Sequence, residues 1–376
     1  MNSEIAIKPN MLTWAIDRAG YDLEEFLLHN PVVEKWMEDL KKPTVKQLEK
    51  FAQKVHLPFG YLFLPEPPRE EIPFPFFRTG RREHSQRVSL NVYDSILTLQ
   101  NRQEWLSSYL RDNGTAPLEF VGRFSEDSPH LNIVADIRKV LNLAPDWARQ
   151  FSTFEDSLAH LTKRIEAVGI IINFNGVVGN NTHRPVPVEE CRGFVLVDPI
   201  APFMFVNAAD AKAAQLFTIV HELAHIWIGE SAGFDNQNLL PANDPAEILC
   251  DQVAAEFLVP KENFLTLWNE TQDFRKISRV FKVSPIVIAR RALDLGKISK
   301  VQFFGFYNEY MAAFMAKKEN RGSGGDFYAT SRKRISPSFA SYVSQAVKEN
   351  RLLYRDAYKM TGLNGKTFEN FVAKLY

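Results

Sequence analysis

Apolar side chains recur at helical spacing through residues 9–64, in four short runs separated by turn-forming residues. Asp22 is a typical N-cap residue for the second run, and Pro31 suits the first turn of the third. Trp36 falls on the apolar side of that third run and is expected in a core. The pattern predicts a compact unit of four helices near residues 12–19, 23–28, 31–36 and 45–55.

The stretch PEPPREEIPFPFF that follows this unit, at 65–77, is too rich in proline for a helix or a central strand. We interpret it as a linker that runs over a surface. Its aromatic part, PFPFFR at 73–78, is expected to hold the linker on the core of the protein.

The rest of the chain alternates between helical patterns and a few short apolar runs rich in β-branched and aromatic residues. The fold class predicted is therefore α+β and mainly α, with a small sheet in the middle of the chain. From Ala208 the pattern is helical to the end, apart from GSGGD at 322–326. We expect earlier helices near 91–111, 131–141 and 154–168, and strands within 169–175, 192–198 and 202–207.

The sequence HELAH at 221–225 lies within a long apolar helical pattern. Residues four apart lie one turn apart on the same face of a helix, so His221 and His225 can direct both imidazoles to one point. Two imidazoles, one carboxylate and a water form the open tetrahedral site of catalytic zinc. Glu222 is then placed to act as the general base toward that water. The alternative is a helix with two buried histidines, which would leave both rings in need of partners.

A second amphipathic pattern, EILCDQVAAEFLVP at 247–260, supplies the third ligand. Glu247 is the predicted ligand, with Glu256 as the weaker alternative. Asp251 lies one turn after Glu247 and is predicted to accept the other ring N–H of a ligand histidine. Cys250 lies beside these residues, and we interpret it as a small buried apolar side chain rather than a reactive thiol.

Two features beyond the ligands bear on catalysis. The apolar run at 202–207 is a candidate edge strand beside the cleft, to which an extended substrate adds as a further strand. A second donor for the developing oxyanion has three candidates, His183, Arg192 and Tyr328, each of which also has a structural interpretation.

The composition argues against several classes of protein. The 376 residues contain 45 basic and 45 acidic side chains, so no overall field indicates nucleic acid or membrane as a partner. Two cysteines, Cys191 and Cys250, favour a reducing compartment over a disulfide-bonded secreted protein. The start MNSEIAIKPN does not have the pattern of a signal peptide, and no run of 18 apolar residues predicts a membrane span. We therefore expect a cytoplasmic protein.

HELAHIWIG followed by EILCDQVAAEFLVP resembles the ImmA/IrrE family of metallo-endopeptidases. The segment 176–218 resembles the region that leads into the metal helix in longer members, and FKVSPIVIARRALDLGKIS and GGDFY resemble their C-terminal part. PTVKQLEKFAQKVHLPFGYLFLPEPP resembles the helix-turn-helix half of the same architecture, of phage-repressor type. The similarity thus extends over most of the chain.

This resemblance implies a gluzincin-like core, in which a small sheet accompanies a helix with two histidines and a helix with the third ligand. It implies one Zn²⁺ per chain and the cleavage of a regulatory protein, such as a repressor or an antitoxin-like partner, in stress response or mobile-element control. The expected domains are a helix-turn-helix-like unit (1–68), a proline-rich linker and helical connector (69–150), the zinc metallopeptidase core (151–300) and a basic helical region (301–376).

DNA is a partner that the sequence does not favour. The helix expected to read bases, PVVEKWMED, offers Glu34, Lys35, Glu38 and Asp39, a poor set of side chains for approaching phosphates. The basic tail after Lys317 is interpreted as solvated faces of small helices. The alternative function is a transcriptional regulator or antitoxin-like binding protein in which the zinc site is structural or vestigial.

Overall fold

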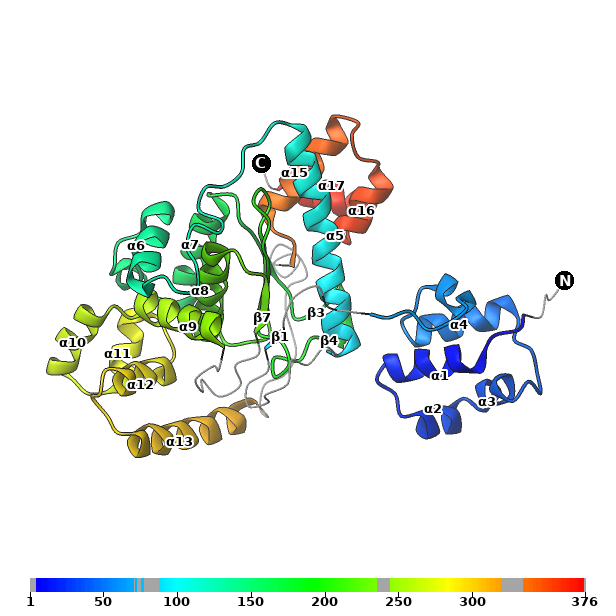
Figure 1. Cartoon of the computed structure of the whole chain (residues 1–376), viewed down its shortest axis with the longest axis horizontal. Coiled ribbons are helices and arrows are strands. Elements are labelled where there is room, and N and C mark those ends of the chain that lie inside the picture. The colour runs from blue at the N-terminus through cyan, green and yellow to red at the C-terminus, as the bar shows by residue number, and fades with distance from the viewer. Residues whose placement is uncertain are drawn as a thin grey trace. The chain divides into compact units, whose positions relative to one another are not determined.

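The computed structural model describes residues 5–70, 72, 76–77, 88–234, 244–318 and 334–374 (Figure 1). It divides into two compact units, one of residues 1–73 and 86–94 and the other of residues 74–85 and 95–376. The domain boundaries expected at 68, 150 and 300 stay predictions.

The first unit contains the four helices predicted for it. They are α1 (Pro9–Arg18), α2 (Leu23–His29), α3 (Pro31–Met37) and α4 (Val45–Lys54), followed by the 3₁₀ helix η1 (Phe59–Phe63). The side chain of Asp22 accepts a hydrogen bond from the backbone N–H of Glu25, as expected of an N-cap. Trp36 is 5% exposed and lies in the core of this unit. The likeness to a phage-repressor helix-turn-helix stays a prediction.

The second unit carries the remaining helices and the sheet. Its helices before the metal cluster are α5 (Leu90–Asp112), which begins among residues grouped with the first unit, α6 (His130–Leu141), η2 (Trp147–Gln150) and α7 (Phe154–Glu166). The cluster is built on α8 (Lys212–Ile228) and α9 (Pro245–Leu258). After it come α10 (Lys261–Glu270), α11 (Phe274–Phe281), α12 (Pro285–Asp294), α13 (Lys300–Lys318), α15 (Pro337–Lys348), α16 (Tyr354–Thr361) and α17 (Gly365–Ala373).

The described strands form a small mixed sheet in the order β1-β7-β5-β6-β2, together with a separate hairpin. The sheet consists of β1 (Phe76–Phe77), β2 (Ile171–Phe174), β5 (Gly193–Leu196), β6 (Phe203–Val206) and β7 (Ala232–Phe234), and the hairpin of β3 (Val177–Val178) and β4 (Asn181–Pro185). β1 lies parallel to β7, and β2 lies parallel to β6. β5 is antiparallel to both of its neighbours.

The expectation that residues 202–207 form an edge strand is wrong. β6 pairs with β2 on one side and with β5 on the other, so its backbone offers no free edge to a substrate. All four of its side chains are buried, which is the pattern of a strand covered on both faces. β1, at the edge of the sheet, comes from the linker, which agrees with the expectation that PFPFFR holds the linker on the core.

The helices cover both faces of the sheet (Figure 1). Ile172, Met204 and Val206 share a hydrophobic core with the apolar side of α8. On the opposite face, the ring of Phe203 packs edge-on against Phe339 of α15, with ring centroids 5.6 Å apart. The metal helices thus rest on one side of a sheet that α5 and α15 support from the other.

The prediction of a mainly helical α+β fold is confirmed. The strands β3 and β7 were not predicted because they are too short to show an alternating pattern. β4 was not predicted because its residues, NTHRP, are polar and mostly exposed. The interruption expected at 322–326 lies outside the described residues. Among the helices that the structure describes, none is both long and apolar enough to cross a membrane.

Candidate metal centre

α8 places its two histidines side by side inside the core. Fourteen consecutive residues of this helix, Gln215–Ile228, are buried, and His221 and His225 lie one turn apart among them. The helix ends at Gly229, whose φ of 81° is the left-handed conformation that glycine adopts readily. The long apolar pattern predicted this helix, and its buried side carries both imidazoles.

α9 presents Glu247 from its first turn. The side chain of Asp244 caps the helix by accepting hydrogen bonds from the backbone N–H groups of Ala246 and Glu247, and Pro245 occupies the first helical position. A carboxylate in the first turn also interacts favourably with the helix dipole. The start of α9 is therefore fixed at the point where its carboxylate meets α8.

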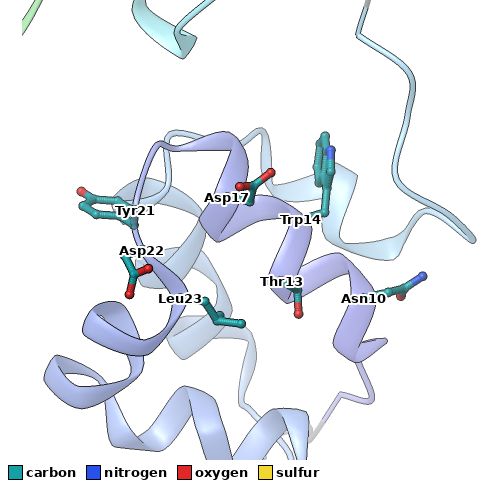
Figure 2. Close-up of a pocket in the computed structure, with 7 residues that line it drawn as sticks. All are labelled: Asn10, Thr13, Trp14, Asp17, Tyr21, Asp22 and Leu23. Atoms are coloured by element: carbon teal, nitrogen blue, oxygen red, sulfur yellow. The ribbon is translucent and has the colours of Figure 1, made fainter. Parts of the chain in front are cut away.

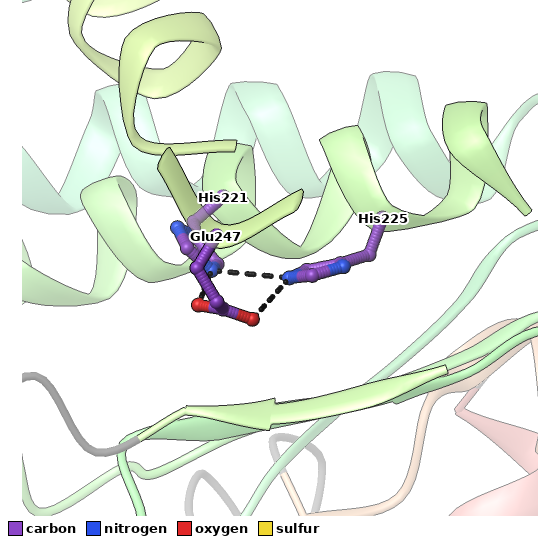
Figure 3. A group of neighbouring side chains, drawn as sticks. All are labelled: His221, His225 and Glu247. Carbon is purple, nitrogen blue, oxygen red and sulfur yellow. Dashed lines mark hydrogen bonds and ion pairs between the residues drawn. The ribbon is translucent and has the colours of Figure 1, made fainter. Parts of the chain in front are cut away.

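The side chains of His221, His225 and Glu247 converge on one point (Figure 3). His221 Nε2 lies 3.1 Å from Oε2 of Glu247, and His225 Nε2 lies 3.1 Å from Oε1. The two Nε2 atoms are 3.2 Å apart. The three side chains are at most 2% exposed. This is the group that the sequence predicted as metal ligands.

These three distances fit a metal ion. A tetrahedral ion with bonds of about 2.0–2.1 Å separates its ligand atoms by about 3.3–3.4 Å, close to the spacing seen here. Within the part of the chain that the structure describes, Oε1 of Glu247 accepts no hydrogen bond of normal geometry, although His225 Nε2 is 3.1 Å away. The imidazole and carboxylate donors are also a set typical of a catalytic zinc site. The structure therefore supports a metal site at this group, without identifying the ion.

Asp251 supports one of the two histidines. Its Oδ1 lies 3.1 Å from Nδ1 of His221, on the side of the ring away from Glu247. A carboxylate in this position accepts the Nδ1–H and leaves the lone pair of Nε2 directed at the cluster. This is the contact predicted for Asp251.

The cluster is electrostatically coupled. Burial lowers the pKa of His221, but the carboxylates of Glu247 and Asp251 outweigh it and raise that pKa to about 10. For Glu247, burial raises the pKa. The interactions with His221 and His225 lower it more strongly, and the resulting pKa is about 2. A proton on His221 thus neutralises Glu247 when no metal does so.

Glu222 is buried beside the ligands, without a polar partner among the described residues. It is 0% exposed, and neither of its carboxylate oxygens makes a hydrogen bond within the described part of the chain. Burial raises its pKa well above the usual range, and the charge of His221 acts in the opposite direction. An acceptor held without a partner next to metal ligands is free to take a proton from a bound water. Its role as the base stays a prediction.

Gly193 of β5, which the sequence interpretation did not identify, lies next to this carboxylate. A Cβ added at Gly193 would lie 3.1 Å from Oε1 of Glu222 and 2.4 Å from Cγ2 of Thr218. The glycine thus makes room for α8 and for the general-base candidate. No local sequence signal could reveal this contact, because it joins positions 29 residues apart in the chain.

The other candidates from the sequence lie elsewhere. Glu256 pairs with Arg291 and is not a member of the cluster, so the alternative ligand is excluded in this structure. Arg192 pairs with Asp210, with Nη1 3.0 Å from Oδ2, and His183 is exposed on β4. Tyr328 lies outside the described residues. Cys250 is buried, and burial raises its pKa well above the usual range, as expected of an unreactive thiol.

A cavity of about 670 Å³ lies in the first unit, along α1 and the turn that follows it (Figure 2). Its lining contains two aromatic rings and two carboxylates but no histidine or cysteine, so it does not offer the donor set of the metal cluster. The lining residues are Asn10, Thr13, Trp14, Asp17, Tyr21, Asp22 and Leu23.

Comparison with known proteins gives two matches. Residues 176–293 match the model of a peptidase family, M78, described as the IrrE N-terminal-like domain. Residues 335–374 match a domain of unknown function, DUF8813. The first match contains the whole cluster together with Gly193 and Glu222, and the second contains α15, α16 and α17. A comparison with curated protein sequences gives no match.

Proposed function

Since residues 176–293 of this chain are an IrrE N-terminal-like domain of peptidase family M78, we propose that the protein is a zinc-dependent endopeptidase. The observation that carries the proposal is the convergence of His221, His225 and Glu247 inside this domain, next to the buried Glu222, which has no hydrogen-bond partner among the described residues. We assign one Zn²⁺ to these three ligands, because two imidazoles and one carboxylate suit zinc. We place the protein in the cytoplasm.

The roles of the side chains follow from their positions. Bound zinc would supply a Lewis acid that polarises the scissile carbonyl and makes its water more acidic. Glu222 accepts a proton from the attacking water at a carboxylate oxygen and returns it to the nitrogen of the leaving amine. Asp251 holds His221 in the tautomer that binds through Nε2.

The substrate we propose is a specific regulatory protein, a repressor or an antitoxin-like partner, in stress response or mobile-element control. The resemblance of the metal motif to the ImmA/IrrE family supports this choice. The burial of all three ligands and of Glu222 also supports narrow specificity, because little of their surface is open to a passing peptide.

The proposal is tested by comparing wild type with Glu222→Gln. Both proteins, loaded with zinc, are incubated with a lysate of the source cells, and new protein N-termini are identified by labelling and mass spectrometry. We expect a few new N-termini from wild type, and a loss of about 10²–10⁴-fold in their rate of formation with the variant. Gln keeps the size of the side chain, so zinc content is expected to be unchanged.

The same experiment separates the proposal from its alternative, a regulator or antitoxin-like binding protein with a structural or vestigial zinc site. A binding protein would give identical N-termini for wild type, for Glu222→Gln and for buffer alone. That result, from zinc-loaded protein, would overturn the assignment as a peptidase.

A further inference from the structure

The last three described helices, α15–α17, bury a set of side chains that take no part in the proposed peptidase site. Ala357, Thr361 and Leu363 are buried in and just after α16, and Phe368 and Phe371 are buried in α17. Tyr358 and Phe368 pack together with ring centroids 5.5 Å apart. These residues join α16 and α17 into one small core against α15.

A turn of three residues, Gly362–Asn364, joins α16 to α17. Gly362 has a φ of 67° and donates its N–H to the carbonyl of Tyr358, and the buried Leu363 follows it. A three-residue turn with a glycine between two short helices is the connection found in the helix-turn-helix motif. Within it, α17 takes the position of the helix that enters the major groove of DNA.

The side chains that such a motif presents to DNA are exposed here. Along α17 and its first flanking residue, Asn364, Lys366, Glu369 and Asn370 are exposed. On α16, which would cross the backbone of the duplex, Tyr354, Arg355 and Lys359 are exposed. Each of the two helices thus buries one set of positions and leaves another set exposed, as a helix-turn-helix on a duplex requires.

The charge of this region suits a polyanion. Residues 335–374 contain six basic and three acidic side chains, although the whole chain is neutral. Glu349 accepts a hydrogen bond of 2.9 Å from the hydroxyl of Tyr109. Asp356 pairs with Arg355 and Arg351 pairs with Asp112, each at 3.2 Å, so the basic excess on the exposed sides of α16 and α17 comes from Lys359 and Lys366. Glu369 is the acid on the exposed side of α17. By contrast, α3 and the residues after it expose Glu34, Lys35, Glu38 and Asp39.

We propose that α15–α17 bind double-stranded DNA, with α17 in the major groove. Lys366 and Asn370 are placed to contact base edges, as Lys does with guanine and Asn with adenine. Arg355 and Lys359 are placed to contact phosphates. This proposal does not depend on the peptidase activity.

The motif is firmly attached to the rest of its unit. The hydroxyls of Ser336 and Ser338 both donate to the carboxylate of Glu166 on α7, and Asn180 of the hairpin donates to the carbonyl of Gly362 at 2.9 Å. DNA bound at α17 and a substrate bound at the metal cluster would therefore be held by one compact unit.

The test measures binding of the full chain to a labelled duplex of about 20–30 base pairs and mixed sequence, by fluorescence anisotropy at about 50 and 200 mM salt. The variant Arg355→Glu/Lys359→Glu/Lys366→Glu is expected to weaken binding by at least about tenfold at the lower salt. The matched control, Lys42→Glu/Lys46→Glu/Lys50→Glu, changes the net charge equally on exposed positions of the first unit and is expected to bind as wild type does. Circular dichroism checks that both variants are folded.

A single variant keeps the test valid if the triple variant does not fold. Lys359→Ala is expected to reduce the slope of log affinity against log salt by about one. The proposal is overturned if wild type does not bind at about 50 mM salt, or if the control triple loses as much affinity as the α16–α17 triple. Tighter binding to an RNA duplex of the same sequence would overturn it as well.

Discussion

Gly193 shows how closely the chain packs around the general-base candidate. Its missing side chain leaves space for the carboxylate of Glu222 on α8, and the backbone carbonyl of Phe205 closes the same space, 3.0 Å from where a Cβ would lie. A backbone atom cannot give way as a flexible side chain does. The position of Glu222 therefore depends on a residue that has no chemistry of its own.

Gly193→Ala is expected to destabilise the protein by about 1–3 kcal/mol, because the added methyl group overpacks the contact between β5 and α8. The measurement is the free energy of unfolding in denaturant. Gly305→Ala is the control, since a Cβ there meets nothing within 4 Å, and in a helix it should stabilise by about 0.5–1 kcal/mol. Equal effects of the two substitutions would contradict the packing described at Gly193.

His221 gives the metal site a predictable dependence on pH. Its raised pKa, about 10, means that without metal the ring carries a proton at neutral pH, and this proton must leave before Nε2 can bind an ion. Zinc affinity is therefore expected to rise by about tenfold for each pH unit between 6 and 8. Competition with a chelating dye at several pH values measures this slope. An affinity that is constant over that range would show that His221 is already deprotonated.

Much of the site could be predicted from single residues. The spacing of His221 and His225 in an apolar helix, and a second apolar helix with an acid in its first turn, were enough to select the three ligands. Glu256 could not be excluded from the sequence, because its neighbour Arg291 is 35 residues further along the chain. The contact at Gly193 could not be predicted either, since it depends on how β5 packs against α8.

At the scale of elements, the site is a junction between α8 and α9. The N-cap at Asp244 sets where α9 begins, and one turn after Glu247 the same face carries Asp251, which reaches Nδ1 of His221. The imidazole of His221 on α8 thus contacts α9 twice, through Glu247 and through Asp251. The pattern of the sequence predicted both helices and this pair of carboxylates.

Asp251→Asn is expected to reduce zinc affinity by about 10–100-fold, because the amide is a poorer acceptor for the Nδ1–H and orients the imidazole less well. The change is isosteric, and Asp251 is partly exposed, so the unfolding free energy of the metal-free protein should change little. Competition with a chelator measures the affinity. Unchanged zinc binding would mean that Asp251 does not support the ligand.

The strands were harder to predict than the helices. The apolar run at 202–207 indicated a strand but not its neighbours, and its prediction as an edge failed because β2, from residues 171–174, pairs along it. Such pairings join distant parts of the chain and leave no periodic signal in either part. β7 consists of three residues, Ala232–Phe234, too few for any pattern.

At the scale of the whole molecule, the chain combines a separate helical unit with a unit that holds both the metal cluster and the motif α15–α17. The last forty residues are basic although the whole chain is neutral. The overall composition therefore argued against nucleic acid as a partner. The short turn between α16 and α17, and the exposed Lys359 and Lys366 on these two helices, led us to propose DNA as a partner of the C-terminal helices.

The central claim, that His221, His225 and Glu247 bind a catalytic metal ion, is tested most directly by the metal content of the purified protein. Elemental analysis should find about one zinc per chain in wild type and in Glu222→Gln, and a loss of zinc in Glu247→Ala and in His221→Ala/His225→Ala. Wild-type protein that is folded, contains no metal and does not take up added zinc would contradict the account.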